Sequence, residues 1–138
     1  MKLSTFVAAG VFIFLSAFVM KKEKKTQTPL FDTKWKLTRM ETGGTLQEVN
    51  TKAFIRFNKE KKSAGGNGGC NTFGSTLSLD GNKISFSGIF STKMYCEGIQ
   101  QSEDIFFKLL EKINRFEARD HSLFLYNGEV LLLEFRSE

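Results

Sequence analysis

The chain has 138 residues, of which 20 are Lys or Arg and 15 are Asp or Glu, so its formal net charge is +5. Residues 1–29 contain five lysines and one glutamate and contribute +4, which leaves +1 for residues 30–138. A domain this close to neutral lacks the basic surplus that binding to a phosphate backbone requires, which argues against a nucleic-acid partner. The length is typical of a single domain.

The first 20 residues form an apolar leader. Residues 3–20 carry no charge and lie between Lys2 and the sequence KKEKK, and their length is close to the ~20 apolar residues that span a bilayer as a helix. Residues 1–20 are therefore interpreted as a signal peptide or an N-terminal membrane anchor. This favours an exported protein of the cell envelope that faces the periplasm and contacts the membrane through this segment, and it disfavours a cytosolic enzyme.

The end of the leader is lipoprotein-like but lacks the lipid attachment residue. Leu15, Ser16 and Ala17 match the first three positions of a bacterial lipoprotein box, whereas Phe18 stands where the lipid-bearing cysteine belongs. We therefore expect no lipidation there. Residues 21–29, KKEKKTQTP, are polar and end in the only proline. They predict a linker, and its lysines are either simply solvated or attracted to anionic lipid head groups.

Residues 30–138 show mainly the period-two pattern of β-strands. Trp35 and Leu37 share one face of KWKLTRM, and Ile84 and Phe86 share one face of NKISFSG. The segments AFIRFN, STLSL, RFEAR, SLFLYN and EVLLLEFR read in the same way. Short alternating runs of this kind predict half-buried antiparallel strands.

Two dipeptides predict tight hairpins between these strands. Asp80-Gly81 separates STLSL from KISFS, and Asn127-Gly128 separates SLFLY from EVLLLEF. Both pairs tolerate the positive backbone angles of a two-residue turn.

One segment has helical periodicity instead. From Ser102, a candidate N-cap, the sequence SEDIFFKLLEKIN places acidic residues in the first turn and apolar residues at helical spacing. The acidic residues are Glu103 and Asp104, and the apolar residues are Phe106, Leu109, Leu110 and Ile113. We expect this helix to cover an open end or face of the sheet. The predicted fold is mainly β with one helix, namely a small antiparallel β-barrel-like or strongly curved sheet packed with a helix near the C-terminus.

A glycine cluster, SAGGNGGCNTFGST at residues 63–76, is the most unusual part of the sequence. It lacks the Lys-Ser/Thr pair of a Walker loop and the spacing of a dinucleotide fingerprint, so it is not a typical phosphate cradle. Two chemical alternatives remain for the cysteine in this cluster. One is a nucleophile made of Cys70 and His121, and the other is a zinc site made of Cys70, Cys96 and His121. The scattered spacing of these residues disfavours both.

The strings GGNGGCNTFGSTL and ISFSGIFSTKMYC together resemble two linked motifs of the HslJ/META domain family. The matching residues are Gly69, Cys70, Asn71, Phe73 and Gly74 in the first motif and Thr92, Lys93, Met94 and Cys96 in the second. The resemblance extends over roughly residues 30–136, through the early Trp35 and the closing L-x-L and L-x-F patterns.

The resemblance implies a small β-barrel-like domain of the bacterial envelope whose family names refer to heat shock, with no established ligand or reaction. It also implies that the glycines shape a tight or bulged corner with positive backbone angles, in which Asn71 bonds the turn backbone. Cys70 and Cys96 are then candidates for a structural disulfide that closes about 26 residues and stabilises by roughly 3.5 kcal/mol. Two buried thiols are the alternative.

The functional hypothesis is a non-catalytic META/HslJ-like envelope domain that acts as a stress-related binding or interaction module. The partner is an unidentified protein or small molecule, and no cofactor, no metal and a monomeric state are expected. The region around Asn67 and Asn71 with residues 92–97 is the surface expected for an interaction, and the alternative is that these residues only shape and staple the corner. One alternative is a carrier with a barrel cavity for a small apolar ligand, because the chain has 15 phenylalanines. Another is an enzyme that uses Cys70 or acidic residues.

Overall fold

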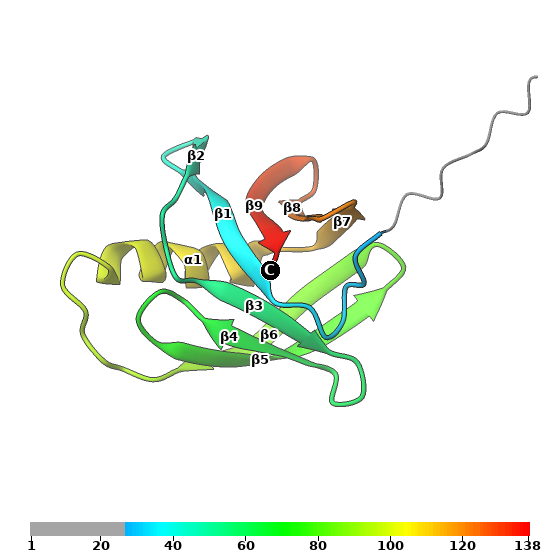
Figure 1. The fold of residues 1–138 in the computed structure, drawn as a ribbon, viewed down its shortest axis with the longest axis horizontal. Coiled ribbons are helices and arrows are strands. Elements are labelled where there is room, and N and C mark those ends of the chain that lie inside the picture. The colour runs from blue at the N-terminus through cyan, green and yellow to red at the C-terminus, as the bar shows by residue number, and fades with distance from the viewer. Residues whose placement is uncertain (1–26) are drawn as a thin grey trace, which may run out of the picture.

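The computed structural model describes residues 27–138, in which nine β-strands and one α-helix are found (Figure 1). In chain order these are β1 (Trp35–Thr42), β2 (Thr45–Glu48), β3 (Phe54–Asn58), β4 (Ser63–Asn67), β5 (Thr72–Asp80), β6 (Lys83–Ser91), α1 (Gln100–Lys112), β7 (Arg115–Arg119), β8 (Ser122–Asn127) and β9 (Val130–Ser137). All the strand pairings are antiparallel.

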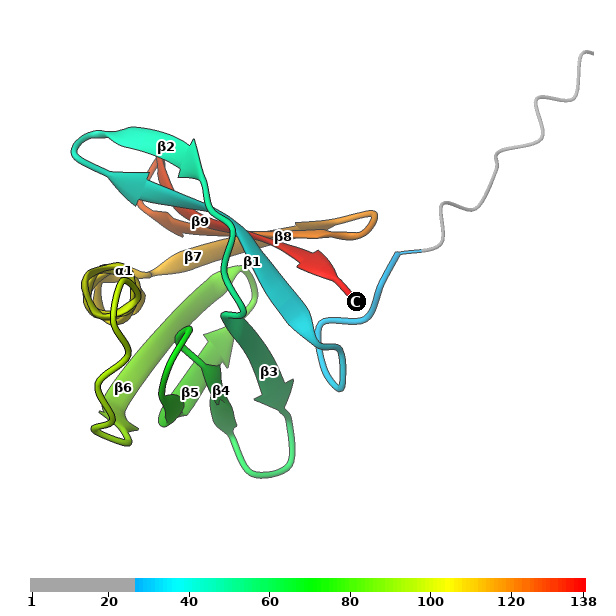
Figure 2. The same cartoon turned by 60° about the vertical axis from the view of Figure 1, so that its left-hand side comes forward.

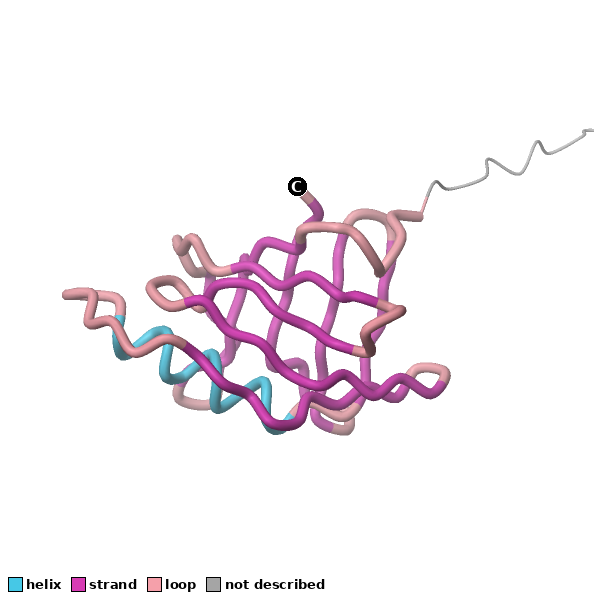
Figure 3. The backbone as a smooth tube through the Cα atoms, turned by 90° about the horizontal axis from the view of Figure 1, so that it is seen from below, coloured by secondary structure: helices cyan, strands magenta, loops and turns pink. Residues whose placement is uncertain are grey.

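The sheet curves into a ring because its first and last strands also pair. The strand order is β2-β1-β3-β4-β5-β6-β7-β8-β9, and β1 pairs with β9. The ring is weakest between β6 and β7, where only Lys83 and Arg115 are paired. Figure 2 shows α1 end-on between β6 and β7, and Figure 3 shows the strands curving around the interior. The predicted fold class is therefore confirmed, as an irregular ring rather than a regular barrel.

Side chains fill the interior of the ring. The predicted inward residues Trp35, Leu37, Ile84 and Phe86 are all buried. The helix adds its apolar face, and its buried residues pack with the core of the sheet. These helix residues are Phe106, Leu109, Leu110 and, at its C-terminal end, Ile113. Aromatic rings also meet inside, since the Phe106 ring centroid lies 5.7 Å from that of Phe73 and 6.3 Å from that of Phe135.

Both predicted hairpins are present. Gly81 and Gly128 occupy the turns before β6 and β9 with φ values of 58° and 57°. The predicted N-cap is wrong by three residues: α1 begins at Gln100, its N-cap residue Ile99 makes no side-chain capping bond, and Ser102 lies inside the helix. Instead, the backbone nitrogen of Gln100 donates to the carbonyl oxygen of Cys96, and the backbone nitrogen of Glu103 donates to the carbonyl oxygen of Ile99.

The expectation that the glycine cluster forms a corner is only partly correct. Gly65 and Gly66 lie in strand β4, which the sequence did not predict, and within the cluster only Gly69 has a positive φ, at 121°. An added Cβ on Gly66 would lie 2.1 Å from the carbonyl oxygen of Phe54, and one on Gly65 would lie 2.9 Å from that of Phe73. Close approach of neighbouring strands, rather than turn geometry, therefore requires these glycines.

Strand β2 was also not predicted. Its sequence TLQE is largely exposed and has no buried face, and it is held by pairing with β1 from Arg39 to Thr42. Because the period-two signal comes from one buried face, a strand without one leaves no such pattern in the sequence.

The predicted leader, residues 1–20, lies outside the described residues, as does most of the predicted linker, residues 21–29. In residues 27–138 no helix is long and apolar enough to cross a membrane. The described chain begins against the β7–β8 turn, where the backbone nitrogen of Thr28 donates to the carbonyl oxygen of Asp120 at 3.0 Å.

A surface cluster on β7 and β8 predicts a loss of stability in acid. The Arg115 guanidinium donates a 2.9 Å hydrogen bond to Glu117 and holds the pKa of that carboxyl below its ordinary value of 4.5, with help from Arg119. A carboxyl with a lowered folded-state pKa adds stability above its unfolded pKa, and this is lost as the pH falls through the folded value. The stability difference between wild type and Glu117→Gln should therefore shrink as urea unfolding is repeated from about pH 6 to about pH 3. A constant difference would contradict this assignment.

Candidate functional site

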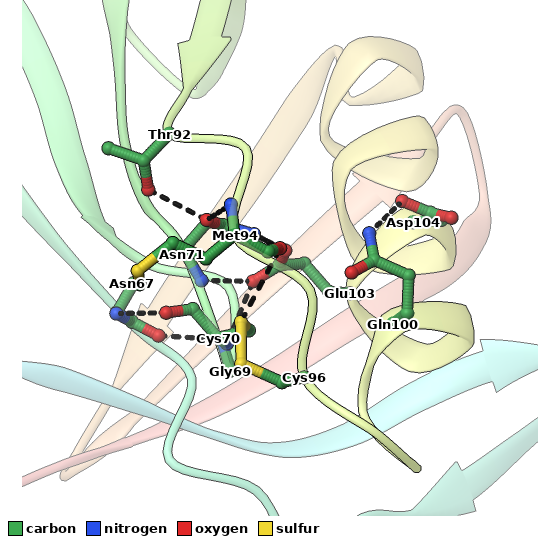
Figure 4. The surroundings of a disulfide bond; sticks show 10 residues. All are labelled: Asn67, Gly69, Cys70, Asn71, Thr92, Met94, Cys96, Gln100, Glu103 and Asp104. Atoms are coloured by element: carbon green, nitrogen blue, oxygen red, sulfur yellow. Dashed lines mark hydrogen bonds between the residues drawn. A yellow bond between two sulfur atoms is a disulfide. The ribbon is translucent and has the colours of Figure 1, made fainter.

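Three segments meet at one end of the ring: the β4–β5 loop, the segment between β6 and α1, and the first turn of α1. Cys70 and Cys96 form a disulfide between the first two segments, with their Cα atoms 5.9 Å apart (Figure 4). Both cysteines lie in loops, not on neighbouring strands. The disulfide consumes the Cys70 thiol that the nucleophile and zinc alternatives required.

The carboxylate of Glu103 lies at the centre of this site. Glu103 is 1% exposed, and one of its oxygens, Oε2, accepts hydrogen bonds from the backbone nitrogens of Cys70 at 2.8 Å and Asn71 at 2.6 Å. Its other oxygen, Oε1, accepts from Asn71 Nδ2 at 2.6 Å. No salt bridge to Glu103 is found in residues 27–138. Three N–H donors thus hold a buried carboxylate without a cation.

Asn71 connects this carboxylate to the segment before α1. Asn71 is 2% exposed, its Oδ1 accepts from the backbone nitrogen of Met94 at 2.7 Å, and its Nδ2 donates to the carbonyl oxygen of Met94 at 3.0 Å. Thr92 Oγ1 also donates to Oδ1 at 2.8 Å. The side-chain amide therefore satisfies both backbone groups of Met94, much as a neighbouring strand would.

The β4–β5 loop, which contains Gly68 and Gly69, forms an anion-binding concavity, and a carboxylate of the same chain occupies it. Successive backbone N–H groups that converge on one point form a concavity suited to an anion, and here the Glu103 carboxylate fills it. Gly68 lets α1 approach, because an added Cβ would lie 2.6 Å from the Phe107 ring and 2.8 Å from Glu103 Cγ. The loop therefore has no room for an external phosphate.

Sequence reasoning missed the role of Glu103, although the chain contains a signal for it. Glu103 precedes Phe106 by three residues and Leu110 by seven, which places its carboxylate on the apolar stripe of the helix. An acidic residue on the buried face needs hydrogen-bond donors from elsewhere in the fold. It was assigned only to the first turn of the helix, where acidic residues are common.

The other motif residues divide into buried and exposed groups. Phe73 is buried, and its ring centroid lies 5.3 Å from that of Phe107. Gly74 makes room for the ring of Phe90, which would lie 2.6 Å from an added Cβ. Lys93 is exposed, and its Nζ lies 3.3 Å from Ser91 Oγ.

Large apolar side chains are exposed beside the site. Phe90 is 70% exposed, Met94 59% and Tyr95 78%. We call these three residues the apolar ridge. Met94 and Tyr95 also line a pocket of about 240 Å³ together with Phe107 and Asp104 of α1.

A second, larger groove of about 960 Å³ runs along the disulfide. It is lined by Cys70 and Cys96, by Lys34, Lys36 and Lys52, and by Glu138. His121 lies elsewhere, in the β7–β8 turn, where its Nδ1 is 2.8 Å from Thr28 Oγ1. Among residues 27–138, no group of three His, Cys, Asp or Glu side chains is placed to hold a metal ion.

The fold and the site define a class of small β-domain in which one helix closes a ring of antiparallel strands and a buried carboxylate holds a disulfide-linked corner. Residues 28–138 match the META domain, and the chain belongs to the META domain family, to which the HslJ-like proteins belong. A comparison with curated proteins finds no match.

Solved structures with this fold include two determined by NMR. A protein from Burkholderia xenovorans is 26% identical with a TM-score of 0.62, over 79% of this chain and 83% of that one. A second protein is 18% identical with a TM-score of 0.58, over 78% of this chain and 90% of that one, and it shows likeness of fold alone.

Proposed function

We propose that this META-family protein is a non-catalytic, exported domain of the cell envelope that acts as a stress-related interaction module. The observation that carries the proposal is the apolar ridge, formed by Phe90 near the end of β6 and by Met94 and Tyr95 on the segment between β6 and α1. Exposed aromatic and methionine side chains are enriched where proteins bind other proteins. If residues 1–20 direct export, as the sequence predicts, the ridge is accessible to other proteins of the envelope.

The way the ridge is held favours binding. Asn71 fixes both backbone groups of Met94, and the disulfide fixes Cys96 two residues later. Binding by a flexible loop costs free energy because the loop must be ordered, whereas a loop that is already fixed avoids most of that cost. Glu103 and Asn71 therefore support the ridge from inside without touching the partner.

The alternative of a small apolar-ligand carrier receives less support. Aromatic and aliphatic side chains occupy the ring interior, and the two hollows at the site are open at the surface. A carrier of the kind considered needs an enclosed apolar cavity. The abundant phenylalanines contribute to the core, as Phe57, Phe106 and Phe135 do.

A double variant of the ridge tests this proposal. Met94→Ser with Tyr95→Ser should lower partner capture from detergent-solubilised native envelopes at least about 10-fold, because such anchor residues carry most of the binding energy. Unfolding free energy should change by less than about 0.5 kcal/mol, since both side chains are exposed. Capture is measured by quantitative mass spectrometry against the wild type.

Val130→Ser is the matched control, because Val130 is 58% exposed but lies at the start of β9, away from the ridge. This variant should retain the captured partner and should restore growth of a deletion strain under heat or envelope stress, as the wild type does. Equal capture by all three proteins, or full rescue by the ridge variant, would show that the ridge is not the binding surface.

A further inference from the structure

An open groove runs along the disulfide at the surface. Cys70 and Cys96 both line this groove of about 960 Å³. Cys70 is 9% exposed, whereas Cys96 is half-buried on a segment whose other residues are mostly exposed. Cys96 is therefore the more exposed residue of the pair. Exchange rates depend on which sulfur an attacking thiolate can reach.

The charge of the groove selects the kind of thiol. Lys34, Lys36 and Lys52 line it against one acidic side chain, Glu138. Glu138 forms ion pairs with Lys34 and Lys36, and Lys52 forms no salt bridge within residues 27–138. Fixed positive charge beside a reactive centre raises the local concentration of anions. Small thiols that carry carboxylates are therefore favoured over cationic ones.

Non-covalent contacts also hold the segments that carry the two cysteines. The backbone nitrogen of Cys70 donates to Glu103, and Asn71 bonds both backbone groups of Met94, so neither contact uses a cysteine sulfur. The bonds between Asn71 and Met94 join the same two segments that the disulfide joins, and the bond to Glu103 holds the β4–β5 loop against α1. The reduced protein should therefore stay folded, with its thiols positioned to form the bond again.

We propose that the Cys70–Cys96 disulfide is a site of thiol–disulfide exchange with small anionic thiols. The thiolate attacks Cys96 Sγ, a new sulfur–sulfur bond forms, and the Cys70–Cys96 bond breaks with its electron pair going to Cys70 Sγ. Cys70 then takes up a proton from water, and the carbonyl oxygen of Met94, 3.7 Å from its sulfur, can accept a hydrogen bond from the thiol. A second small thiolate then attacks the small-thiol sulfur of the mixed disulfide. A bond forms between the two small-thiol sulfurs, and the bond to Cys96 Sγ breaks with its electron pair going to Cys96, which takes up a proton from water. The products are two protein thiols and an oxidised small disulfide.

This site adjoins the apolar ridge, since Cys96 follows Tyr95, but the proposal does not depend on the proposed function. Its test uses the full chain, purified in detergent, and two thiol probes of opposite charge: glutathione, which is anionic, and cysteamine, which is cationic. At equal thiolate concentrations and low salt, glutathione should open the disulfide roughly threefold faster or more, and added salt should reduce the ratio. Acid-quenched samples are read by mass spectrometry with peptide mapping, and the mixed disulfide should map to Cys96.

Charge variants distinguish the effect of the groove lysines on the rate ratio from the effect of overall surface charge. Lys52→Gln should lower the glutathione-to-cysteamine ratio, whereas Lys61→Gln, in the β3–β4 turn outside the groove, should leave it unchanged. The near-ultraviolet circular dichroism of the reduced protein should remain native. Equal rates for the two thiols, a mixed disulfide at Cys70, or opening only after the protein is denatured would each overturn the proposal.

Discussion

Replacing Glu103 by glutamine should destabilise the protein by about 2 to 4 kcal/mol, although the two side chains have nearly the same shape. The carboxylate accepts from two backbone nitrogens through Oε2 and from the Asn71 amide through Oε1. A glutamine has one acceptor and one donor end, so its NH₂ group must face either the backbone N–H groups or Asn71 Nδ2. Both arrangements set donor against donor at a buried site.

Turning the Asn71 amide does not repair this conflict. If its oxygen faced the glutamine NH₂, its nitrogen would face the backbone N–H of Met94 and its oxygen would also face the carbonyl of Met94. Each orientation therefore leaves a buried polar group unsatisfied. Urea unfolding measures the loss. Asp104→Asn is the matched control on the same helix, where the side chain is exposed, and it should change stability by less than about 0.5 kcal/mol. Equal stability of wild type and Glu103→Gln would show that the carboxylate is not the required acceptor.

Gly66→Ala should cost about 3 kcal/mol or more, because the added methyl group meets backbone and not a movable side chain. The new Cβ would lie 2.1 Å from the carbonyl oxygen of Phe54 and 3.1 Å from the Cα of Ile55. Strands β3 and β4 would have to move apart, and five residue pairs hold them in register. The variant should unfold at lower urea concentration and at lower temperature than the wild type.

Gly74→Ala provides the control for this prediction. The atoms nearest to a Cβ at Gly74 belong to the ring of Phe90, which is 70% exposed and free to turn away. Its cost should stay below about 1 kcal/mol, since volume changes beside movable side chains are relieved easily. If the two variants lost equal stability, contact with the backbone of Phe54 would not be the reason for a glycine at position 66.

The sequence predicted the parts of this protein that depend on local pattern. Trp35, Leu37, Ile84 and Phe86 are buried as period two predicts, and the apolar face of the helix packs inward. The hairpins at Gly81 and Gly128 follow from the backbone angles that glycine allows. Family motifs brought Cys70 and Cys96 together as a candidate pair, and the structure has them bonded.

Other elements left no local signal, or left one that pointed elsewhere. Strand β2 has no buried face to give an alternating pattern, and the glycines of β4 are poor strand formers. Ser102 has the residue type of an N-cap, but backbone bonds from the preceding loop set the helix start at Gln100. In these places tertiary contacts outweigh local propensity.

By itself, then, the sequence determined which residues face the core and where the chain makes its tight turns, because both depend on residues that are close along the chain. The tertiary structure alone decided that β1 pairs with β9 and that Glu103 binds the amides of residues 70 and 71, more than 30 positions earlier. A carboxylate on the apolar face of a helix indicates only that hydrogen-bond donors are needed nearby. The donors are determined only when the ring closes, because closure brings the β4–β5 loop against the first turn of α1.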